Sequence, residues 1–254
     1  MRLGSALLAL GLLALTPDIG ATAGPVPVVE RSFVIAIDPG HGGTNGGCVA
    51  FDGEIREKDV TLAMAQELRR ALAQRLPHAT VVLTRTGDET VTLAERVARA
   101  NAAEADLMIS LHANASGAGP QTGFETYVLD LDLAERDTAV TARGTDEGEA
   151  ARAQAMTMVR ELELITHRAR AMGFARRIQQ EQAERFPGRV DRGVKQAGFD
   201  VLMGARMPAV LFEAGFLDHP HEGRRLLDGA QRGLVIDGLA ESVVDYYRDH
   251  ARER

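Results

Sequence analysis

The sequence predicts a single layered α/β domain in which helices flank a mixed, largely parallel central sheet. Short apolar runs with strand character alternate along the chain with longer segments of helical periodicity, as expected for a layered α/β domain. The 254 residues are enough for one large domain, and they contain no long Pro/Ser-rich linker and no internal repeat. One catalytic-size domain is therefore the better interpretation.

Each predicted element follows from local composition and period. Apolar, β-branched runs bounded by turn formers predict strands at 33–37, 80–84, 106–111, 123–129 and 208–213, and 194–202 is strand-like but interrupted by Gly198. Helical spacing predicts helices from Glu57 or Asp59 to Pro77, over about 93–104, from about 149 to 186, and at the C-terminus. A capping box, Thr92-Leu-Ala-Glu95, marks the start of the second helix, and a break is expected near Thr166 and Gly173 in the third.

The N-terminus has the pattern of a secretory signal peptide. A positive start at Arg2 is followed by the apolar run Leu3–Leu15 and by small residues at Ala21 and Ala23. The run is too short to anchor the chain in a bilayer, and no cysteine follows it for lipidation. The alternative is a buried N-terminal helix. We expect a signal peptide over 1–23, a short segment over 24–32 and a catalytic domain over 33–250, exported to the periplasm or beyond.

Charge and cysteine content narrow the functional class. The formal net charge of −7, with no tryptophan, argues against non-specific nucleic-acid binding, which needs a basic surface. The single cysteine, Cys48, cannot form an internal disulfide. It is either a soft metal ligand or a small buried residue, and the second interpretation is favoured. We expect a monomer.

Three predicted inner strands lead into polar residues that can carry chemistry. His41 follows the first strand in the turn Asp38-Pro-Gly-His-Gly-Gly43, His112 follows the third, and Glu213 ends the last. The carboxyl ends of parallel strands share one edge of a sheet, where α/β proteins place their sites. With Glu57 at the start of the next helix, this edge gathers two imidazoles and two carboxylates.

This set fits a hydrolytic zinc site, although each residue alone has a structural explanation. Two histidines and one carboxylate commonly hold zinc with water in the open position, and a second carboxylate serves as base. Alone, however, His41 is equally a turn residue and His112 a sheet-edge histidine, whereas an unpaired Glu213 beside an apolar core is costly. The remaining histidines are expected to lie elsewhere: His78, His167, His219, His221 and His250.

Competing motifs are incomplete. In Gly40-His-Gly-Gly-Thr-Asn45 an asparagine replaces the third glycine of a dinucleotide fingerprint, and the following helix starts too late. The His-Gly-Gly triplet is similar to the oxyanion loop of serine esterases, but no serine lies in Gly-x-Ser-x-Gly. The chain also lacks a phosphate loop and a His-Glu-x-x-His helix.

Five motifs in order resemble the zinc-dependent N-acetylmuramoyl-L-alanine amidases of the bacterial cell wall, the amidase-3 type. They are Ile37-Asp-Pro-Gly-His-Gly-Gly43, Glu57-Lys-Asp-Val-Thr-Leu62, Ser110-Leu-His-Ala-Asn114, Asp191-Arg-Gly-Val-Lys-Gln-Ala197 and Pro208-Ala-Val-Leu-Phe-Glu-Ala-Gly-Phe216. The resemblance covers roughly residues 33–248.

The resemblance implies a set of roles. His41, Glu57 and His112 would bind one zinc ion, and Glu213 would be the catalytic carboxylate. The substrate would be peptidoglycan, cut at the amide between the lactyl group of N-acetylmuramic acid and L-alanine, in wall remodelling or daughter-cell separation. Asp38 and Asn114 flank the ligands, and we expect them to support the ligands by hydrogen bonding.

Two departures from the family pattern stand out. Asn45 occupies a place where the family usually has aspartate, which affects the geometry expected of the loop. Extra chain at about 131–165 is similar in place to an insert that, in some cell-division relatives, covers the zinc with a helix and a blocking glutamate. Gln154–Leu164 is a candidate for that helix, with Glu161 or Glu163 as the plug and a protein activator to relieve it. The alternative is an exposed charged helix.

Two rival functions are also compatible with the sequence. One is a zinc peptidase or amidase that acts on another cell-envelope amide. The other is a catalytically inactive wall-binding module, although a binding module has no need of Glu213.

Overall fold

A computed structural model describes residues 31–117, 119–131 and 147–250. The expected signal peptide and residues 132–146 of the expected insert lie outside the described residues. By its contacts, the chain from Ser32 onward forms one compact unit. No helix in the described part of the chain has the length and apolar character that crossing a bilayer requires.

A six-stranded mixed sheet runs through this unit, in the order β2-β1-β3-β6-β4-β5. The strands are β1 (Val34–Pro39), β2 (Thr80–Leu83), β3 (Leu107–Asn114), β4 (Phe124–Leu129), β5 (Asp191–Ala197) and β6 (Ala209–Phe216). Neighbouring strands pair in parallel except β4 and β6, which are antiparallel. The predicted fold class, α/β with a mixed and largely parallel sheet, is confirmed.

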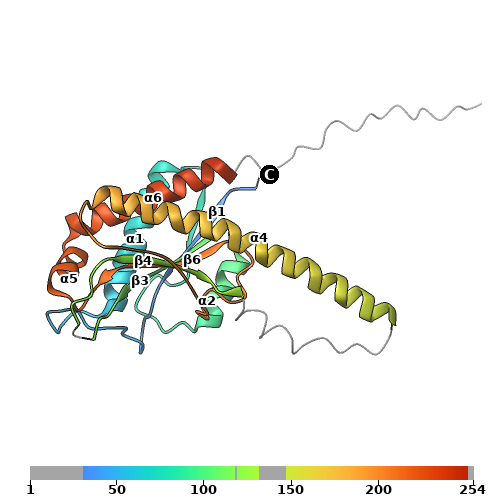
Figure 1. Cartoon of the computed structure of the whole chain (residues 1–254), viewed down its shortest axis with the longest axis horizontal. Helices are drawn as coiled ribbons and strands as arrows, with labels where there is room; N and C mark the ends of the chain where they lie inside the picture. The colour runs from blue at the N-terminus through green and yellow to red at the C-terminus, as the bar shows by residue number, and fades with distance from the viewer. Residues whose placement is uncertain (1–30, 118, 132–146, 251–254) are drawn as a thin grey trace, which may run out of the picture. The chain divides into compact units, whose positions relative to one another are not determined.

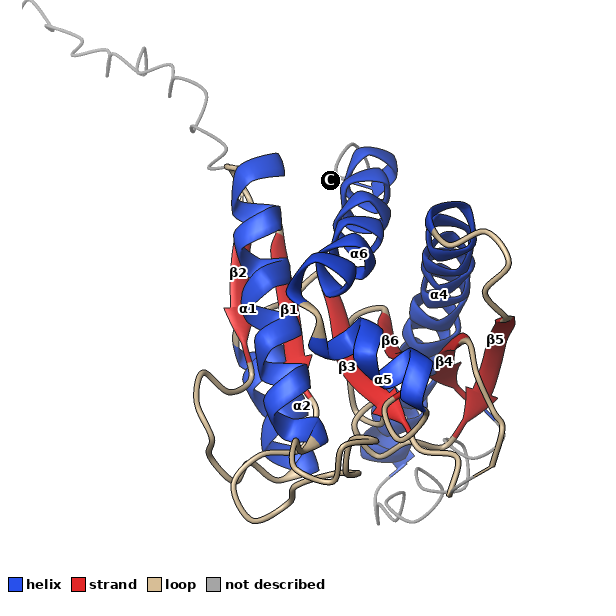
Figure 2. Cartoon of the chain, turned by 90° about the vertical axis from the view of Figure 1, so that its left-hand side faces the viewer, coloured by secondary structure: helices blue, strands red, loops and turns tan. Residues whose placement is uncertain are grey.

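Three long helices cover one face of the sheet. They are α1 (Glu57–Arg75), α4 (Glu147–Arg185) and α6 (Gly229–His250), and they lie side by side in Figure 2. The short helix α5 (Pro220–Leu227) packs on α6 and β6. Helix α2 (Leu93–Ala102) starts at the predicted capping box, in which Thr92 accepts from the Glu95 backbone and Glu95 bonds back to Thr92.

Alternation along the strands separates two apolar clusters. In β1, Ile35 and Ile37 pack with the long helices, whereas Val34 and Ala36 belong to a second cluster with Ala100 and a turn-rich stretch at 199–207. In the central strands, residues 109 and 212 belong to the first cluster, and 108 and 211 to the second. Because side chains alternate along a strand, His112 and Glu213 lie on the same face of the sheet as the second cluster. This face is opposite the one that the three long helices cover.

The structure differs from the sequence-based expectation at three elements. The break expected near Thr166 and Gly173 is wrong, because α4 is one continuous helix, and Figure 1 shows its N-terminal part extending beyond the other labelled elements. Strand β5 begins at Asp191 and ends before Gly198, where a strand over 194–202 was expected. Helix α5 was not predicted, because its eight residues are too few to show a clear period.

Candidate active site

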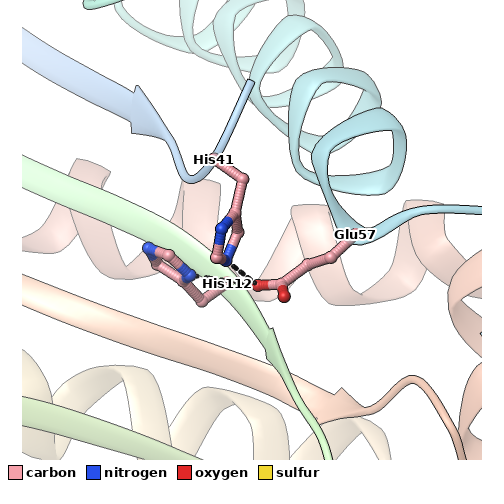
Figure 3. A group of neighbouring side chains, drawn as sticks. All are labelled: His41, Glu57 and His112. Carbon is pink, nitrogen blue, oxygen red and sulfur yellow. Dashed lines mark hydrogen bonds and ion pairs between the residues drawn. The ribbon is translucent and has the colours of Figure 1, made fainter. Parts of the chain in front are cut away.

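Three side chains from three different elements converge at one edge of the sheet. His41 comes from the turn after β1, Glu57 from the first turn of α1 and His112 from β3 (Figure 3). Glu57 Oε1 lies 2.9 Å from His41 Nε2 and 3.0 Å from His112 Nδ1. One ligand atom from each residue falls within 4.8 Å of the others. The sequence-predicted ligand set is therefore brought together.

Glycines in the turn make room for this convergence. A Cβ on Gly40 would lie 2.3 Å from the His112 ring. A Cβ on Gly47 would lie 2.5 Å from Glu57 Oε2 and 2.8 Å from His41 Cδ2, and Gly47 also has a φ of +67°. His41 itself has a φ of 60°, a left-handed conformation that is costly for a non-glycine residue. The surrounding structure must hold this turn in place.

Two buried arginines hold the turn by its carbonyl groups. Arg96 donates to Pro39 O at 2.6 Å and to His41 O, and its Nη1 lies 2.8 Å from Asp38 Oδ1. Arg85 donates to Pro39 O and Gly40 O, each at 2.9 Å. Both arginines are at most 3% exposed. Hydrogen bonds between buried guanidinium groups and carbonyl oxygens are strong because water does not compete for them. A movement of the turn would break these bonds, so the turn is held in place.

Asn45 fixes the orientation of His41. Its Oδ1 lies 2.9 Å from His41 Nδ1 and accepts the Gly47 backbone N–H at 3.2 Å. The N–H of Gly47 identifies the oxygen side of the amide, so Nδ1 of His41 is protonated in both the neutral and the charged ring. Nε2 therefore faces Glu57, to which it donates in the charged ring, and it offers a lone pair to a cation in the neutral ring. Asn45 thus contacts a candidate ligand, His41, directly. This role was not evident from its departure from the family pattern.

Protein groups alone favour the ionised form of Glu57. Its Oε2 accepts the Cys48 backbone N–H at 3.0 Å and its Oε1 accepts that of Ala113 at 3.1 Å. Burial raises the pKa of Glu57, but hydrogen bonds from His112 and His41 outweigh it and hold the pKa well below its usual range. Burial also raises the pKa of the Cys48 thiol, with Glu57 adding to the effect. Cys48 Sγ lies 3.5 Å from Ala113 O and is not part of the cluster.

Glu213 stands beside this cluster with an unsatisfied oxygen. It is the register partner of His112 across the parallel β3–β6 pair, which places both side chains on one face. Its Oε2 is buried and has no hydrogen-bond partner among the described residues. Burial, followed by the charges of Glu57 and Glu125, raises the pKa of Glu213 well above its ordinary value. A buried, unpaired carboxyl oxygen is the group expected to accept a proton during chemistry.

Glu125 forms a second polar centre next to Glu213, its antiparallel register partner. Its Oε1 accepts from Asn114 Nδ2 at 2.7 Å and from Tyr127 OH at 3.0 Å. Its Oε2 accepts from Arg192 Nε at 2.7 Å and from Lys195 Nζ. Burial raises the pKa of Glu125, but these bonds outweigh it and lower the pKa to about 2. Sequence reasoning missed Glu125, because a glutamate second in a strand carries no motif.

The donor set fits zinc. Two imidazole nitrogens and one carboxylate oxygen are ligands of catalytic zinc sites, which keep an open position. Bonds of 2.0–2.1 Å at tetrahedral angles would separate ligand atoms by roughly 3.4 Å. The separations of 2.9 and 3.0 Å between Glu57 Oε1 and the two histidine nitrogens are a few tenths of an ångström below that value, and all three ligand atoms lie within 4.8 Å of one another. Burial lowers the pKa of His41, but the hydrogen bond and the negative charge of Glu57 outweigh burial and raise it. The same negative charge would attract a metal cation.

Comparison with known proteins decides the family. Residues 35–245 match the family described as N-acetylmuramoyl-L-alanine amidase. The chain belongs to this family. Its predicted membership of the amidase-3 type is confirmed.

Relatives and solved structures agree with this assignment. The chain is 31% identical over 222 residues to the amidase LytC of Bacillus subtilis (strain 168), covering 87% of this chain and 36% of LytC. It is 33% identical over 209 residues to the amidase CwlM of Bacillus licheniformis, covering 82% of this chain and 66% of CwlM. The catalytic domain of the amidase CwlV from Bacillus (Paenibacillus) polymyxa var. colistinus superposes with a TM-score of 0.65 and 28% identity, covering 85% of this chain and 98% of that domain. The chain therefore spans between about a third and two thirds of the two sequence relatives.

Four predicted residues of this amidase-family chain lie away from the ligands. Asp38 forms an ion pair with Arg96 and accepts hydrogen bonds from Ser110 Oγ, at 2.7 Å, and from Thr84. These contacts stabilise the start of the turn and do not involve a candidate ligand side chain. The side chain of Asn114 bonds to Glu125, as described above. Glu161 and Glu163 are exposed on α4, and among the described residues neither belongs to the cluster. The expected hydrogen bonding of Asp38 and Asn114 to the ligands is therefore not observed.

Proposed function

We propose that the chain hydrolyses the amide between the lactyl group of N-acetylmuramic acid and L-alanine in peptidoglycan. The observation that carries the proposal is the juxtaposition of the His41–Glu57–His112 cluster with the unsatisfied Oε2 of Glu213. Membership of the N-acetylmuramoyl-L-alanine amidase family supports the choice of the scissile amide and of peptidoglycan as the substrate. The predicted alternative of an inactive binding module is disfavoured by a buried carboxyl oxygen that has no structural partner.

In this proposal His41, Glu57 and His112 hold one zinc ion. Zinc, when bound, supplies a Lewis acid that polarises the amide carbonyl and lowers the pKa of water. Glu213 takes the proton of the attacking water at Oε2 and carries it to the leaving nitrogen of alanine. Asn45 keeps the proton of His41 on Nδ1, and the buried arginines keep the turn from moving as the substrate approaches.

Replacing Glu213 with glutamine tests the proposal. We expect Glu213→Gln to retain one zinc per chain by metal analysis and to lose hydrolysis of purified peptidoglycan by about 10²- to 10⁴-fold, the contribution typical of general acid–base catalysis. Glu54→Gln, an exposed carboxylate on the loop before α1, is the matched control. Muropeptide mass spectrometry identifies the bond: stem peptides with a free alanine N-terminus are expected. Zinc binding with cleavage of a different amide would contradict the assignment.

We further propose that the chain is exported by its predicted signal peptide and acts in the cell envelope. The support is the N-terminal sequence pattern together with the wall amidases among its relatives. The test is N-terminal sequencing of the protein recovered from the cell envelope, with cleavage expected after Ala23. An intact Met1 in the envelope fraction, or recovery of the chain only inside the cell, would contradict this proposal.

We also propose that the N-terminal part of α4 regulates the site through a protein partner. The side chains of Met156, Val159, Leu162 and Ile165 recur at intervals of three along this part, and all are exposed. Among solved structures of the same fold, the CwlD amidase of Clostridioides difficile is in complex with the GerS lipoprotein. If Glu161 or Glu163 blocks the site in the resting state, deletion of 143–163 raises basal hydrolysis of purified cell wall. An unchanged rate would reject autoinhibition.

A further inference from the structure

Polar side chains continue along the site face of the sheet beyond Glu213. The sheet order is β3-β6-β4-β5, and His112 pairs with Glu213, which pairs with Glu125. On β5, Lys195 pairs with Tyr127, two residues along β4 from Glu125. Register partners place their side chains on the same face. The row therefore runs from the candidate zinc ligands, through the catalytic carboxylate, to two cations on the edge strand.

The cationic end of this row carries more positive charge than its own carboxylate neutralises. Arg192 and Lys195 share a single oxygen of Glu125, and Asn114 and Tyr127 occupy the other. Two positive charges thus face one negative charge. Glu125 is 3% exposed, whereas the side chains of Arg192 and Lys195 are 26% and 36% exposed. Solvent, and hence a ligand, reaches the cations but not the carboxylate.

Both cations are also held in position with donors to spare. The Arg192 guanidinium lies 5.1 Å from the centre of the Phe216 ring, and Lys195 Nζ lies 5.7 Å from that of Tyr127. Arg192 uses Nε on Glu125 and Nη2 on Gln121, and within the described part of the chain Nη1 has no hydrogen-bond partner. A rigid guanidinium with an available edge is a good partner for a carboxylate.

We propose that Arg192 and Lys195 form a subsite for a carboxylate on the peptide side of the scissile amide. This inference rests on the proposed function. Neighbouring strands lie about 4.8 Å apart, so the two cations stand roughly 5–10 Å from the Glu213 carboxyl. At about 3.4 Å per extended residue, this distance corresponds to roughly one and a half to three residues. N-acetylated sugars carry no charge, whereas the stem peptide carries carboxylates. The subsite therefore recognises the peptide, within its first three residues, and not the glycan.

The first experiment varies only the ligand. The probes are two short peptides with an N-terminal alanine, an acidic second residue and an amidated C-terminus, one with its single carboxylate free and one with it converted to carboxamide. Their binding to the zinc-loaded protein is measured by calorimetry, which needs no hydrolysis. We expect the carboxylate peptide to bind at least about 10-fold more tightly, as a charge-assisted hydrogen bond implies. Equal affinities would overturn the proposal.

The second experiment varies the protein. Lys195→Met leaves three partners on Glu125, so folding is retained, and Arg192→Gln leaves the lysine in place. Each variant is expected to lose most of the preference for the carboxylate, whereas Lys195→Arg keeps it and the control Arg176→Gln, on an exposed part of α4, leaves it unchanged. A preference that survives both losses of charge would refute the subsite. If the wild type shows the preference but does not release stem peptides from muramoyl peptides, the proposed function fails and the subsite stands.

Discussion

Replacing Arg96 is expected to damage both the fold and the metal site. Arg96 makes four hydrogen bonds, to Asp38 Oδ1 and to the carbonyls of Pro39, His41 and Val91. Arg96→Met keeps the length of the side chain but leaves Asp38 fully buried without its cation. Breaking one partner out of a buried ion pair costs about 3–5 kcal/mol. Since domains of this size are stable by about 5–15 kcal/mol, the variant folds but is clearly weakened.

The double variant Asp38→Asn with Arg96→Met separates charge from packing. If the uncompensated carboxylate causes the loss, removing it as well should return at least about 1 kcal/mol relative to the sum of the two single losses. Urea unfolding of the metal-free proteins measures these free energies, with Arg70→Met, an exposed arginine on α1, as control. Strictly additive losses would show that Arg96 acts through packing alone.

Zinc affinity gives the second readout. His41 sits in a left-handed conformation with its carbonyl bonded to Arg96, so the loss of Arg96 lets the turn relax away from the cluster. Supporting contacts of this kind typically change metal affinity by about 10- to 100-fold. Competition with a zinc chelator, under conditions where each variant is folded, measures the change. An affinity equal to that of the wild type would refute the idea that Arg96 positions His41.

Two further predictions use the same assays. Gly47→Ala should lower zinc affinity by at least about 10-fold, because its Cβ would collide with Glu57 and His41, whereas Gly53→Ala, at a φ of +80° with nothing within 4 Å, measures backbone strain alone. The depressed pKa of Glu125, about 2 when folded against about 4.3 when unfolded, adds stability that is complete above about pH 5 and is lost as pH falls towards 2. We therefore compare the free energy of unfolding of the metal-free wild type with that of metal-free Glu125→Gln as the pH is lowered. The difference between them should decrease by about 2 kcal/mol, and a constant difference would contradict this account.

The sequence indicated the candidate metal-binding residues because apolar strand signals that lead into polar residues converge on one edge of the sheet. A buried strand ending in a glycine-rich turn predicts where His41 is presented, and the apolar runs before His112 and Glu213 predict central strands. Parallel pairing then gathers these residues without any knowledge of loop geometry. The fold class was predictable for the same reason, since period and length alone distinguish strands from helices here.

Residues that support the site were not predictable in this way. Asp38 and Asn114 are adjacent to the ligands in sequence, yet their side chains bond to Arg96 and Glu125, which lie 58 and 11 residues away along the chain. Asn45 contacts His41 only because the turn folds back on itself. Such contacts depend on tertiary placement, which sequence proximity to a ligand does not reveal.

The two sides of the site differ in the exposure of their positively charged side chains. On the β1 side of the cluster, buried arginines bind backbone carbonyls of the turn that carries His41 and hold it in place. On the β4 side, exposed cations bind one buried carboxylate and keep donors available. A substrate that spans Glu213 thus meets a rigid catalytic half and a charged, accessible half. Together with the two proposals above, this division would assign bond cleavage to β1, β3 and β6 and recognition of the peptide to β4 and β5.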